Sequence, residues 1–225
     1  MPSLRKPRFA ILGSGRGSNA AVLLDAFLRG DFEAELAVVI SNVASAPILT
    51  IAQNKGFCAA SVEVSGTDRA EQEQRILATL ASHHVDHLLL AGYMRLLSPS
   101  FVQQFPGVIL NIHPSLLPDF PGRTAIADQW HARVQIAGAT VHFVDAGIDS
   151  GPILLSGSLC VRGDEGIEGL ASRVLTEVEH VIYPRAVQLL LHRLAQGTPL
   201  HQEAARTARN EVQVSLPPSR SRSHA

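Results

Sequence analysis

Apolar residues follow two patterns along this chain, and the patterns alternate from the N-terminus to about residue 194. Short, nearly continuous apolar runs are typical of strands buried on both faces of a parallel sheet. Longer segments in which apolar residues recur every three or four positions predict amphipathic helices. We expect strands at residues 8–13, 34–42, 57–64, 86–92 and 108–114, and helices at residues 18–29, 47–56, 67–84 and 165–194, with a short helix between residues 93 and 107.

The alternation of strands and helices predicts an α/β domain. Its core would be a Rossmann-like, mostly parallel twisted sheet with helices on both faces and right-handed crossovers. Residues 138–161 break the rhythm, because two strands follow one another across a loop that contains Gly and Asp. This arrangement favours antiparallel pairing at one side of the sheet, in the C-terminal part of the domain. Pro184 is expected to bend or break the last helix.

The end of the chain has a different composition from the rest. After Gly197 the residues turn polar and finish in SLPPSRSRSHA. Such a segment cannot bury enough apolar surface to order itself. We therefore expect one folded domain over residues 1–196 and a peripheral extension over residues 197–225, whose polar end is disordered.

Composition narrows the possible partners. The 225 residues carry a formal net charge of -1 and are 46% hydrophobic, which suits one globular domain with a sizeable core. A nearly neutral chain gives no reason to expect nucleic acid. No apolar stretch approaches the roughly 20 residues of a spanning helix, so no membrane is expected. Cys58 and Cys160 form no CxxC motif and suggest no disulfide framework, so the expected location is a reducing cytoplasm.

The segment GSGRGSN, residues 13–19, joins the first strand to the first helix. Glycines at such a turn let the backbone approach a ligand, and the unpaired N–H groups at a helix N-terminus attract anions. Ser18 and Asn19 would add side-chain donors. The spacing does not match the dinucleotide fingerprint G-x-G-x-x-G, because a third glycine is missing. A phosphate site is the better interpretation, although a tight turn that only starts a helix would also account for the glycines.

Two further polar clusters follow later strands. Asn111 and His113 end an apolar strand and are two residues apart, so their side chains share one face. Ligands of doubly wound sheets bind at the carboxyl ends of strands, which favours a functional role over a capping Asn and a satisfied core His. In the segment DAGIDSGP, residues 145–152, Asp149 is the better catalytic candidate and Asp145 the better turn residue. A carboxylate beside a histidine favours the charged imidazole.

Two other motifs carry less weight. The segment HHVDH, residues 83–87, places His83 and His87 four residues apart, which would suit two metal ligands on a helix. The helix is expected to end there, so we interpret the cluster as a solvated helix end and expect no metal. Ser115 lacks the G-x-S-x-G context of a nucleophilic serine.

Five segments of the sequence together resemble the glycinamide ribonucleotide formyltransferases of purine biosynthesis. They occur in order between about residues 8 and 190, and NIHPSLLP is specific to the wider formyltransferase superfamily. The turn at residues 11–19 and the segment AGYMRLLSP favour this branch. The segments are ILGSGRGSN, LLLAGYMRLLSPSFV, ILNIHPSLLPDFPG, VHFVDAGIDSGPIL and EHVIYP.

The resemblance implies that residues 1–196 form a formyltransferase catalytic domain. Such an enzyme moves a formyl group from 10-formyltetrahydrofolate to the amine of glycinamide ribonucleotide and needs no metal. The resemblance identifies Asn111, His113 and Asp149 as the catalytic trio. An amide N–H and a protonated imidazole can stabilise the oxyanion of a tetrahedral intermediate, where losing one donor costs about 10²–10³ in rate. Asp149 would keep His113 protonated and help to move the amine proton.

The resemblance also assigns binding residues. Glu179 matches a residue that contacts the ribonucleotide, and Arg69 matches one that pairs with the glutamate tail of the folate. Alone, Arg69 could equally be a surface helix residue, and Met94 and Leu97 could be core. The phosphate turn comprises Gly15, Arg16, Gly17, Ser18 and Asn19, and the folate-binding residues comprise Met94, Arg95, Leu97 and Asn111 besides Arg69.

The sequence departs from the family pattern in two places. Arg123 and Trp130 are unusual after PDFPG, and the segment before EHVIYP is one residue longer than in the family. The alternatives are a sibling folate-dependent formyltransferase that acts on another amine and a nucleotide- or folate-binding protein without turnover. The expected partners are small-molecule substrates, and the expected assembly is a monomer or a homodimer.

Overall fold

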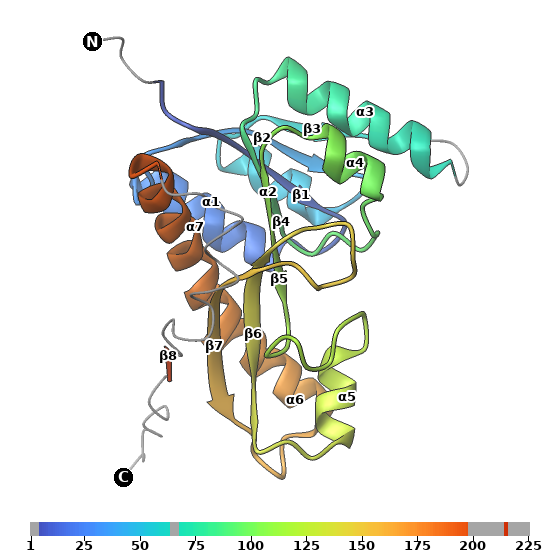
Figure 1. Ribbon diagram of the computed structural model, residues 1–225, viewed down its shortest axis with the longest axis vertical. Coiled ribbons are helices and arrows are strands. Elements are labelled where there is room, and N and C mark those ends of the chain that lie inside the picture. Colours follow the sequence, from blue (N-terminus) through green and yellow to red (C-terminus); the bar gives the residue numbers. More distant parts are fainter. Residues whose placement is uncertain (1–4, 64–67, 198–213, 216–225) are drawn as a thin grey trace.

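The computed structural model describes residues 5–63, 68–197 and 214–215, and its centre is a single twisted sheet (Figure 1). The sheet has eight strands in the order β3-β2-β1-β4-β5-β6-β7-β8. Strands β1 to β5 are parallel, β6 is antiparallel to both neighbours, and β8 pairs with β7 in parallel. The strands are β1 (Arg8–Gly13), β2 (Glu35–Ser41), β3 (Ala59–Ser61), β4 (His87–Leu90), β5 (Val108–His113), β6 (Ile136–Phe143), β7 (Ile153–Cys160) and β8 (Val214–Ser215).

Helices cover both faces of the sheet, as the alternating pattern predicted. One hydrophobic cluster joins β1, β5 and β6 to α1, α2, α6 and α7, and a second joins the opposite face to α3 and α4. Figure 1 shows α3 and α4 on the side of the sheet away from α1 and α7. The helices are α1 (Ser18–Arg29), α2 (Pro47–Asn54), α3 (Arg69–Ser82), α4 (Pro99–Gln104), α5 (Ala125–His131), α6 (Gly166–Arg173) and α7 (His180–Ala195), with a π-helix η1 at Val174–Glu179.

Most element boundaries follow local chemistry that can be read in the sequence. Helix α1 ends at Gly30, whose left-handed φ of 74° lets its N–H reach back to the last turn. Helix α3 is capped by Asp68, which accepts from the N–H of Glu71. The other expected cap, Thr67, lies outside the described residues. Strand β3 is shorter than the expected 57–64, because within the described part it pairs with β2 only at residues 59–61.

The antiparallel part of the sheet decides which residues face the end of β5. Strands β6 and β7 form the expected antiparallel pair. Strand β6 also runs beside β5, with Asn111 opposite His142 and His113 opposite Thr140. The connection from β6 to β7 therefore begins near the start of β5 and has to fold back along it.

The C-terminal helix differs from the prediction. We expected Pro184 to bend or break it, but α7 continues through Pro184, and the irregular turn is the π-helix that precedes it. A π-turn accommodates one extra residue within a helix. This fits the additional residue before EHVIYP and places Glu179 at the junction of η1 and α7. The expected disordered tail falls on residues 198–213 and 216–225, which lie outside the described part of the chain.

Candidate active site

Three loops meet at the carboxyl edge of the parallel strands. They follow β1, β4 and β5, which are adjacent in the sheet. Crossover direction changes between β1 and β4, and such a switch point is where open α/β sheets bind ligands. The loops after β1 and β4 are joined by Ser14, whose N–H donates to the carbonyl of Gly92 at 3.1 Å and whose hydroxyl accepts from the N–H of Met94 at 3.0 Å.

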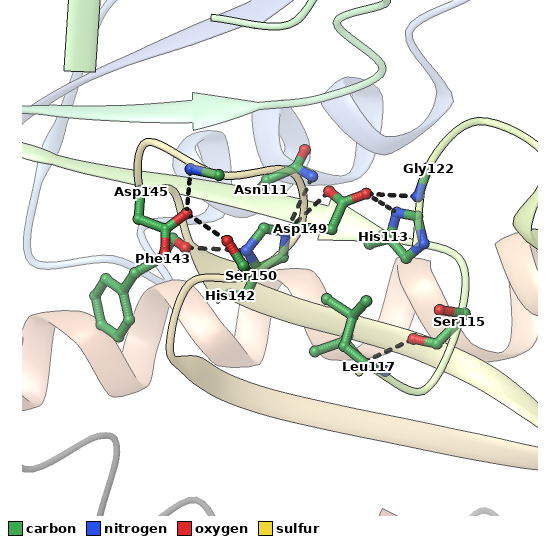
Figure 2. Close-up of polar contacts among 12 residues, drawn as sticks. Asn111, His113, Ser115, Leu117, Gly122, His142, Phe143, Asp145, Asp149 and Ser150 are labelled. Atoms are coloured by element: carbon green, nitrogen blue, oxygen red, sulfur yellow. Dashed lines mark hydrogen bonds and ion pairs between the residues drawn. The ribbon is translucent and has the colours of Figure 1, made fainter. Parts of the chain in front are cut away.

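The three predicted catalytic residues lie together at this edge, although Asp149 comes from a distant loop. Figure 2 shows the Asp149 carboxylate between two imidazoles and beside Asn111. Its Oδ2 atom lies 3.3 Å from Nδ1 of His113 and accepts from the N–H of Gly122 at 2.9 Å. The His113 side chain is 6% exposed and that of Asp149 14%. Their contact is therefore largely shielded from water.

Both ring nitrogens of His113 face acceptors. Nε2 lies 2.9 Å from the carbonyl oxygen of Phe120, and Nδ1 faces the Asp149 carboxylate. A carbonyl and a carboxylate can only accept, so both nitrogens have to carry protons when both contacts are made.

The structure adds a fourth residue, His142 of β6, which the sequence analysis missed. Its Nε2 atom lies 3.2 Å from Nδ2 of Asn111 and 3.6 Å from Oδ1 of Asp149. The residue is 2% exposed, which places it deeper than Asn111. One signal in the sequence was a histidine inside an apolar strand, seven residues before Asp149. Its position opposite Asn111 depends on the register of an antiparallel pair.

The loop that carries Asp149 is held in shape by its own side chains. Asp145 accepts from the N–H of Gly147 and from the hydroxyl of Ser150, both at 2.9 Å. This is the turn role expected for Asp145. Asp149 itself has a left-handed φ of 50°, a conformation uncommon for residues other than glycine and found preferentially at functional sites. The loop therefore directs the Asp149 carboxylate toward the end of β5.

The contacts of Asp149 favour its ionised form. The hydrogen bond from His142 is the largest influence and lowers the pKa of Asp149, with help from the Gly122 N–H and the charge of His113. Burial acts in the opposite direction but does not outweigh these donors. Asp149 is consequently an anion throughout the neutral range.

The glycine turn before α1 has the geometry expected of an anion site. Gly17 adopts φ 77°, and a Cβ on it would come within 2.9 Å of the Ile48 side chain, so this position requires glycine. A Cβ on Gly15 would meet nothing within 4 Å. Among the residues that the structure describes, no side chain caps the N-terminus of the 12-residue helix α1, and Arg16 beside it is exposed. The turn before α1 therefore has both open space and uncapped N–H groups.

Asn19 and Glu179 form a buried pair at this turn. Nδ2 of Asn19 donates to Oε2 of Glu179 at 2.5 Å, and each residue is 8% exposed. We expected the Asn19 amide to add a donor for phosphate, but the structure uses that donor for Glu179. Within the described residues, Oδ1 of Asn19 is buried without a hydrogen-bond partner. Burial raises the pKa of Glu179, and the Asn19 amide only partly opposes this.

The predicted folate-binding residues surround the loop after β4. Met94 is 56% exposed and therefore not core, whereas Leu97 packs partly against the cluster under α3 and α4. Arg95 donates to Oε1 of Gln72 at 2.5 Å, and Arg69 pairs with Glu73 at 3.0 Å. Both arginines thus lie at the α3 side of this loop and remain exposed.

A pocket of about 370 Å³ lies between α4, the start of β5 and the loop after β6. Its lining is largely apolar and includes none of Met94, Arg95 and Leu97. The pocket is formed instead by α4 with the residues that follow it and by the loop between β6 and β7, which carries Asp149. The lining residues used below are Val102, Ile109, Val144, Asp145 and Ala146.

The histidine segment and Ser115 have structural roles. His83 ends α3, and Nδ1 of His87 accepts from the N–H of Val108 at 3.3 Å. Residues 5–63, 68–197 and 214–215 contain no group of three or more His, Cys, Asp or Glu that could hold a metal ion. Ser115 is fully buried and donates to the carbonyl of Asp119 at 2.6 Å.

In the same described part of the chain, no helix is long and apolar enough to cross a membrane.

Comparisons with known proteins identify the family of this chain. The formyl transferase family model matches residues 7–187. The phosphoribosylglycinamide formyltransferase of Bacillus subtilis (strain 168) is 35% identical over 185 residues, which cover 82% of this chain and 94% of that protein. The human trifunctional purine biosynthetic protein adenosine-3 is 37% identical over 195 residues, which cover 86% of this chain but 19% of that protein.

A solved structure supports the same family assignment. The crystal structure of glycinamide ribonucleotide transformylase 1 from Symbiobacterium toebii superposes with a TM-score of 0.80 at 39% identity, covering 84% of this chain and 90% of that chain. The chain belongs to the formyl transferase family, in its phosphoribosylglycinamide formyltransferase branch.

Proposed function

We propose that this enzyme transfers the formyl group of 10-formyltetrahydrofolate to the amine of glycinamide ribonucleotide in de novo purine biosynthesis. The products would be N-formylglycinamide ribonucleotide and tetrahydrofolate. The observation that carries the proposal is the buried contact between His113 and Asp149, 3.3 Å, beside the amide of Asn111. Formyl transfer to an amine needs a group that stabilises a developing oxyanion and a route for the amine proton, and these residues supply both.

The proposed mechanism starts from the charge on His113. Attack of the amine on the formyl carbon gives a tetrahedral intermediate whose oxygen becomes negative. The contact of His113 with Asp149 is the longer of its two, so we expect its Nδ1–H to turn toward that oxygen. The Asn111 amide supplies a second donor. Asp149 stabilises the imidazolium and receives the amine proton directly or through water. Collapse of the intermediate then breaks the bond between the formyl carbon and the folate nitrogen, which takes up that proton as tetrahydrofolate leaves.

The family implies a folate-derived formyl donor, and the apolar pocket beside α4 fits the flat ring of the folate. Val102, Ile109 and Val144 offer apolar contacts, and Asp145 and Ala146 also line the pocket. The ring would then lie against the loop that carries Asp149, which brings the formyl group to the catalytic residues. Met94, Arg95 and Leu97 would contact the donor from the loop after β4, and Arg69 would pair with its glutamate tail.

The ribonucleotide would bind along the glycine turn. Its phosphate suits the uncapped N-terminus of α1, with Gly15, Gly17 and Ser18 at the backbone and exposed Arg16 nearby. Asn19 and Glu179 suit the ribose, because the unpartnered Oδ1 of Asn19 is an acceptor and a hydroxyl is a donor. We therefore assign the buried pair to sugar hydroxyls and the turn itself to phosphate.

An absorbance assay for tetrahydrofolate release tests the proposal. The enzyme is mixed with 10-formyltetrahydrofolate, with and without glycinamide ribonucleotide. Release that depends on the ribonucleotide is the expected result. Release without any amine would mean hydrolysis of the donor, and release only with a different amine would assign the enzyme to a sibling reaction.

A further inference from the structure

Two neighbouring polar residues of α3, Gln72 and Glu73, are buried although their helix lies at the surface. Gln72 is 4% exposed and Glu73 5%, and a buried carboxylate needs donors around it. Oε1 of Glu73 accepts from the backbone N–H of Ser98 at 2.8 Å and from Nε of Arg69 at 3.0 Å, and Oε2 accepts from the Ser98 hydroxyl. Ser98 therefore supplies two of the three donors that the structure describes for Glu73.

Ser98 is the residue at which the loop after β4 passes into α4. Its hydroxyl also accepts from the N–H of Phe101 at 3.0 Å and so caps α4. Helix α4 packs against the same hydrophobic cluster as α3 (Figure 1), and its residue Val102 lines the pocket assigned to the folate ring. By holding Ser98, Glu73 therefore holds one wall of that pocket.

The rest of the loop after β4, residues 91–98, is held at further points. Oε1 of Gln72 accepts from Arg95 at 2.5 Å, and the turn after β1 makes two hydrogen bonds to the first half of the loop. Between these anchors the apolar side chains of Met94 and Leu96 stay 56% and 55% exposed. A fixed backbone that leaves apolar side chains in water suits a pre-organised ligand site better than a core.

We propose that Glu73 is a positioning residue for the formyl donor, because it holds the loop after β4 and the start of α4 in the shape that binds the folate ring. This inference rests on the proposed function, which assigns the folate to this loop and to the pocket beside α4. It goes beyond the binding residues named above, since Glu73 is buried and acts through Ser98. The same carboxylate orients Arg69, so one buried group serves both the ring and the tail of the folate.

Binding of tetrahydrofolate, measured by isothermal titration calorimetry, tests the proposal without reference to turnover. We expect Glu73→Ala to weaken this binding by about 10-fold or more, because Ser98 loses a charged acceptor and the loop is no longer held. Binding of glycinamide ribonucleotide to the same variant should change little, which also shows that the variant is folded. Unchanged folate affinity, or an equal loss for both ligands, would overturn the proposal. Absence of folate binding to the wild type would instead contradict the proposed function.

A folate without its glutamate tail separates positioning of the loop from binding of the tail. Tetrahydropteroate has the ring system of the folate but lacks the glutamate. Glu73→Ala should weaken the binding of tetrahydropteroate and of tetrahydrofolate alike, whereas Arg69→Ala should weaken only that of tetrahydrofolate. If Glu73→Ala weakens only the binding of the tailed folate, Glu73 acts through Arg69 alone and its role in holding the loop is wrong.

Two matched variants complete the test. Glu73→Gln keeps an acceptor for the N–H of Ser98, so it should bind tetrahydrofolate more tightly than Glu73→Ala, and equal weakening in the two would contradict the proposed route through Ser98. Glu71 lies on the same helix and pairs with Arg75, with 45% of its side chain exposed. Glu71→Ala should leave both affinities unchanged. If it lowers folate affinity as much as Glu73→Ala, the effect is a general one of α3 and the proposal is wrong.

Discussion

Two acidic side chains at this site occupy contrasting surroundings. Asp149, on the loop between β6 and β7, is contacted by two imidazoles and one backbone N–H, and its pKa is lowered, chiefly by the hydrogen bond from His142. Glu179, at the junction of η1 and α7, accepts a hydrogen bond from the Asn19 amide, and burial raises its pKa. Burial alone therefore does not decide the charge of a carboxyl group here. The number and charge of the surrounding donors do.

The difference matches the tasks proposed for the two residues. A group that keeps His113 charged has to be an anion before the substrates arrive, and its donors are part of the protein. A group that binds a sugar can leave hydrogen-bonding capacity unused until the ligand provides it. The buried, unpartnered Oδ1 of Asn19 next to Glu179 is such unused capacity. The catalytic carboxylate is thus pre-organised, whereas the binding pair is completed by substrate.

Neutralising Asp149 should have the largest effect. In Asp149→Asn the partner of the His113 cation is lost, so the charged imidazole is no longer favoured. We expect kcat to fall by about 10²–10⁴, the usual contribution of general acid–base groups, with smaller changes in KM. Steady-state turnover at saturating substrates measures this.

Asp145→Asn is the matched control for Asp149, since the Asp145 carboxylate accepts hydrogen bonds from Gly147 and Ser150 of the same loop. It should retain most of the wild-type kcat. The lowered pKa also has a stability consequence: the contribution of Asp149 is present above its unfolded pKa and is lost as pH falls through the folded value. The stability of Asp149→Asn should therefore fall less steeply than that of the wild type as the pH is lowered. An equal acid dependence in both proteins would contradict the ionised assignment.

Removing the cation itself should have the next largest effect. His113→Ala leaves Asp149 in place but removes the charge beside the oxyanion, and we expect kcat to fall by about 10²–10³. Ser115→Ala is the comparison, because the Ser115 hydroxyl supports the neighbouring loop through the carbonyls of Asp119 and Phe120. It should lower the melting temperature and change kcat far less. Equal losses of kcat in the two variants would sink the assigned roles.

Replacing the second carboxyl group should affect binding and stability rather than chemistry. Glu179→Gln keeps an acceptor for the Asn19 amide but removes a buried charge. We expect KM for the ribonucleotide to rise about 10-fold, as for one lost charged hydrogen bond, with kcat nearly unchanged. A group with a raised folded pKa contributes stability at low pH that is lost as pH rises through that value. The melting temperature of Glu179→Gln, measured relative to that of the wild type, should therefore rise as the pH increases.

Glu177→Gln controls for position on the same π-helix. Glu177 is a partly exposed partner of Arg173, with 35% of its side chain accessible, and it does not contact Asn19 among the described interactions. It should change neither KM nor the pH dependence of the melting temperature. If Glu179→Gln behaves like this control, Glu179 does not contact the ribonucleotide.

The sequence predicted the parallel half of the molecule well, for a physical reason. Buried parallel strands and amphipathic helices leave periodic apolar patterns, and Gly17 and Gly30 are at the positions where left-handed backbone is needed. Asn111 and His113 could be found because they interrupt an apolar strand at its carboxyl end. Local chemistry and strand order were enough to bring the glycine turn and these two residues to one edge.

The antiparallel half was less predictable, because its contacts depend on register. His142 faces Asn111 only through the pairing of β5 with β6, which no local pattern reveals. The donor that Asn19 gives to Glu179 joins residues 160 positions apart. Pro184 does not break the last helix, as a proline inside a helix often does, and the irregular turn lies earlier, in η1.

The smallest effect should come from an exposed charge at the edge of the site. Arg69 is paired with Glu73 on one face of α3, and its side chain is 47% exposed, so water and salt screen it as they do not screen Asp149. Arg69→Ala should raise KM for a folate with a glutamate tail by only about 2–5-fold, as expected for an exposed ion pair, and the effect should shrink at high ionic strength. Arg75→Ala, which breaks the pair with Glu71 at 2.5 Å on the same helix, should leave KM unchanged. An Arg69 effect that is large or insensitive to salt would mean that Arg69 is desolvated when the folate binds, and it would then belong with the buried charges rather than the exposed ones.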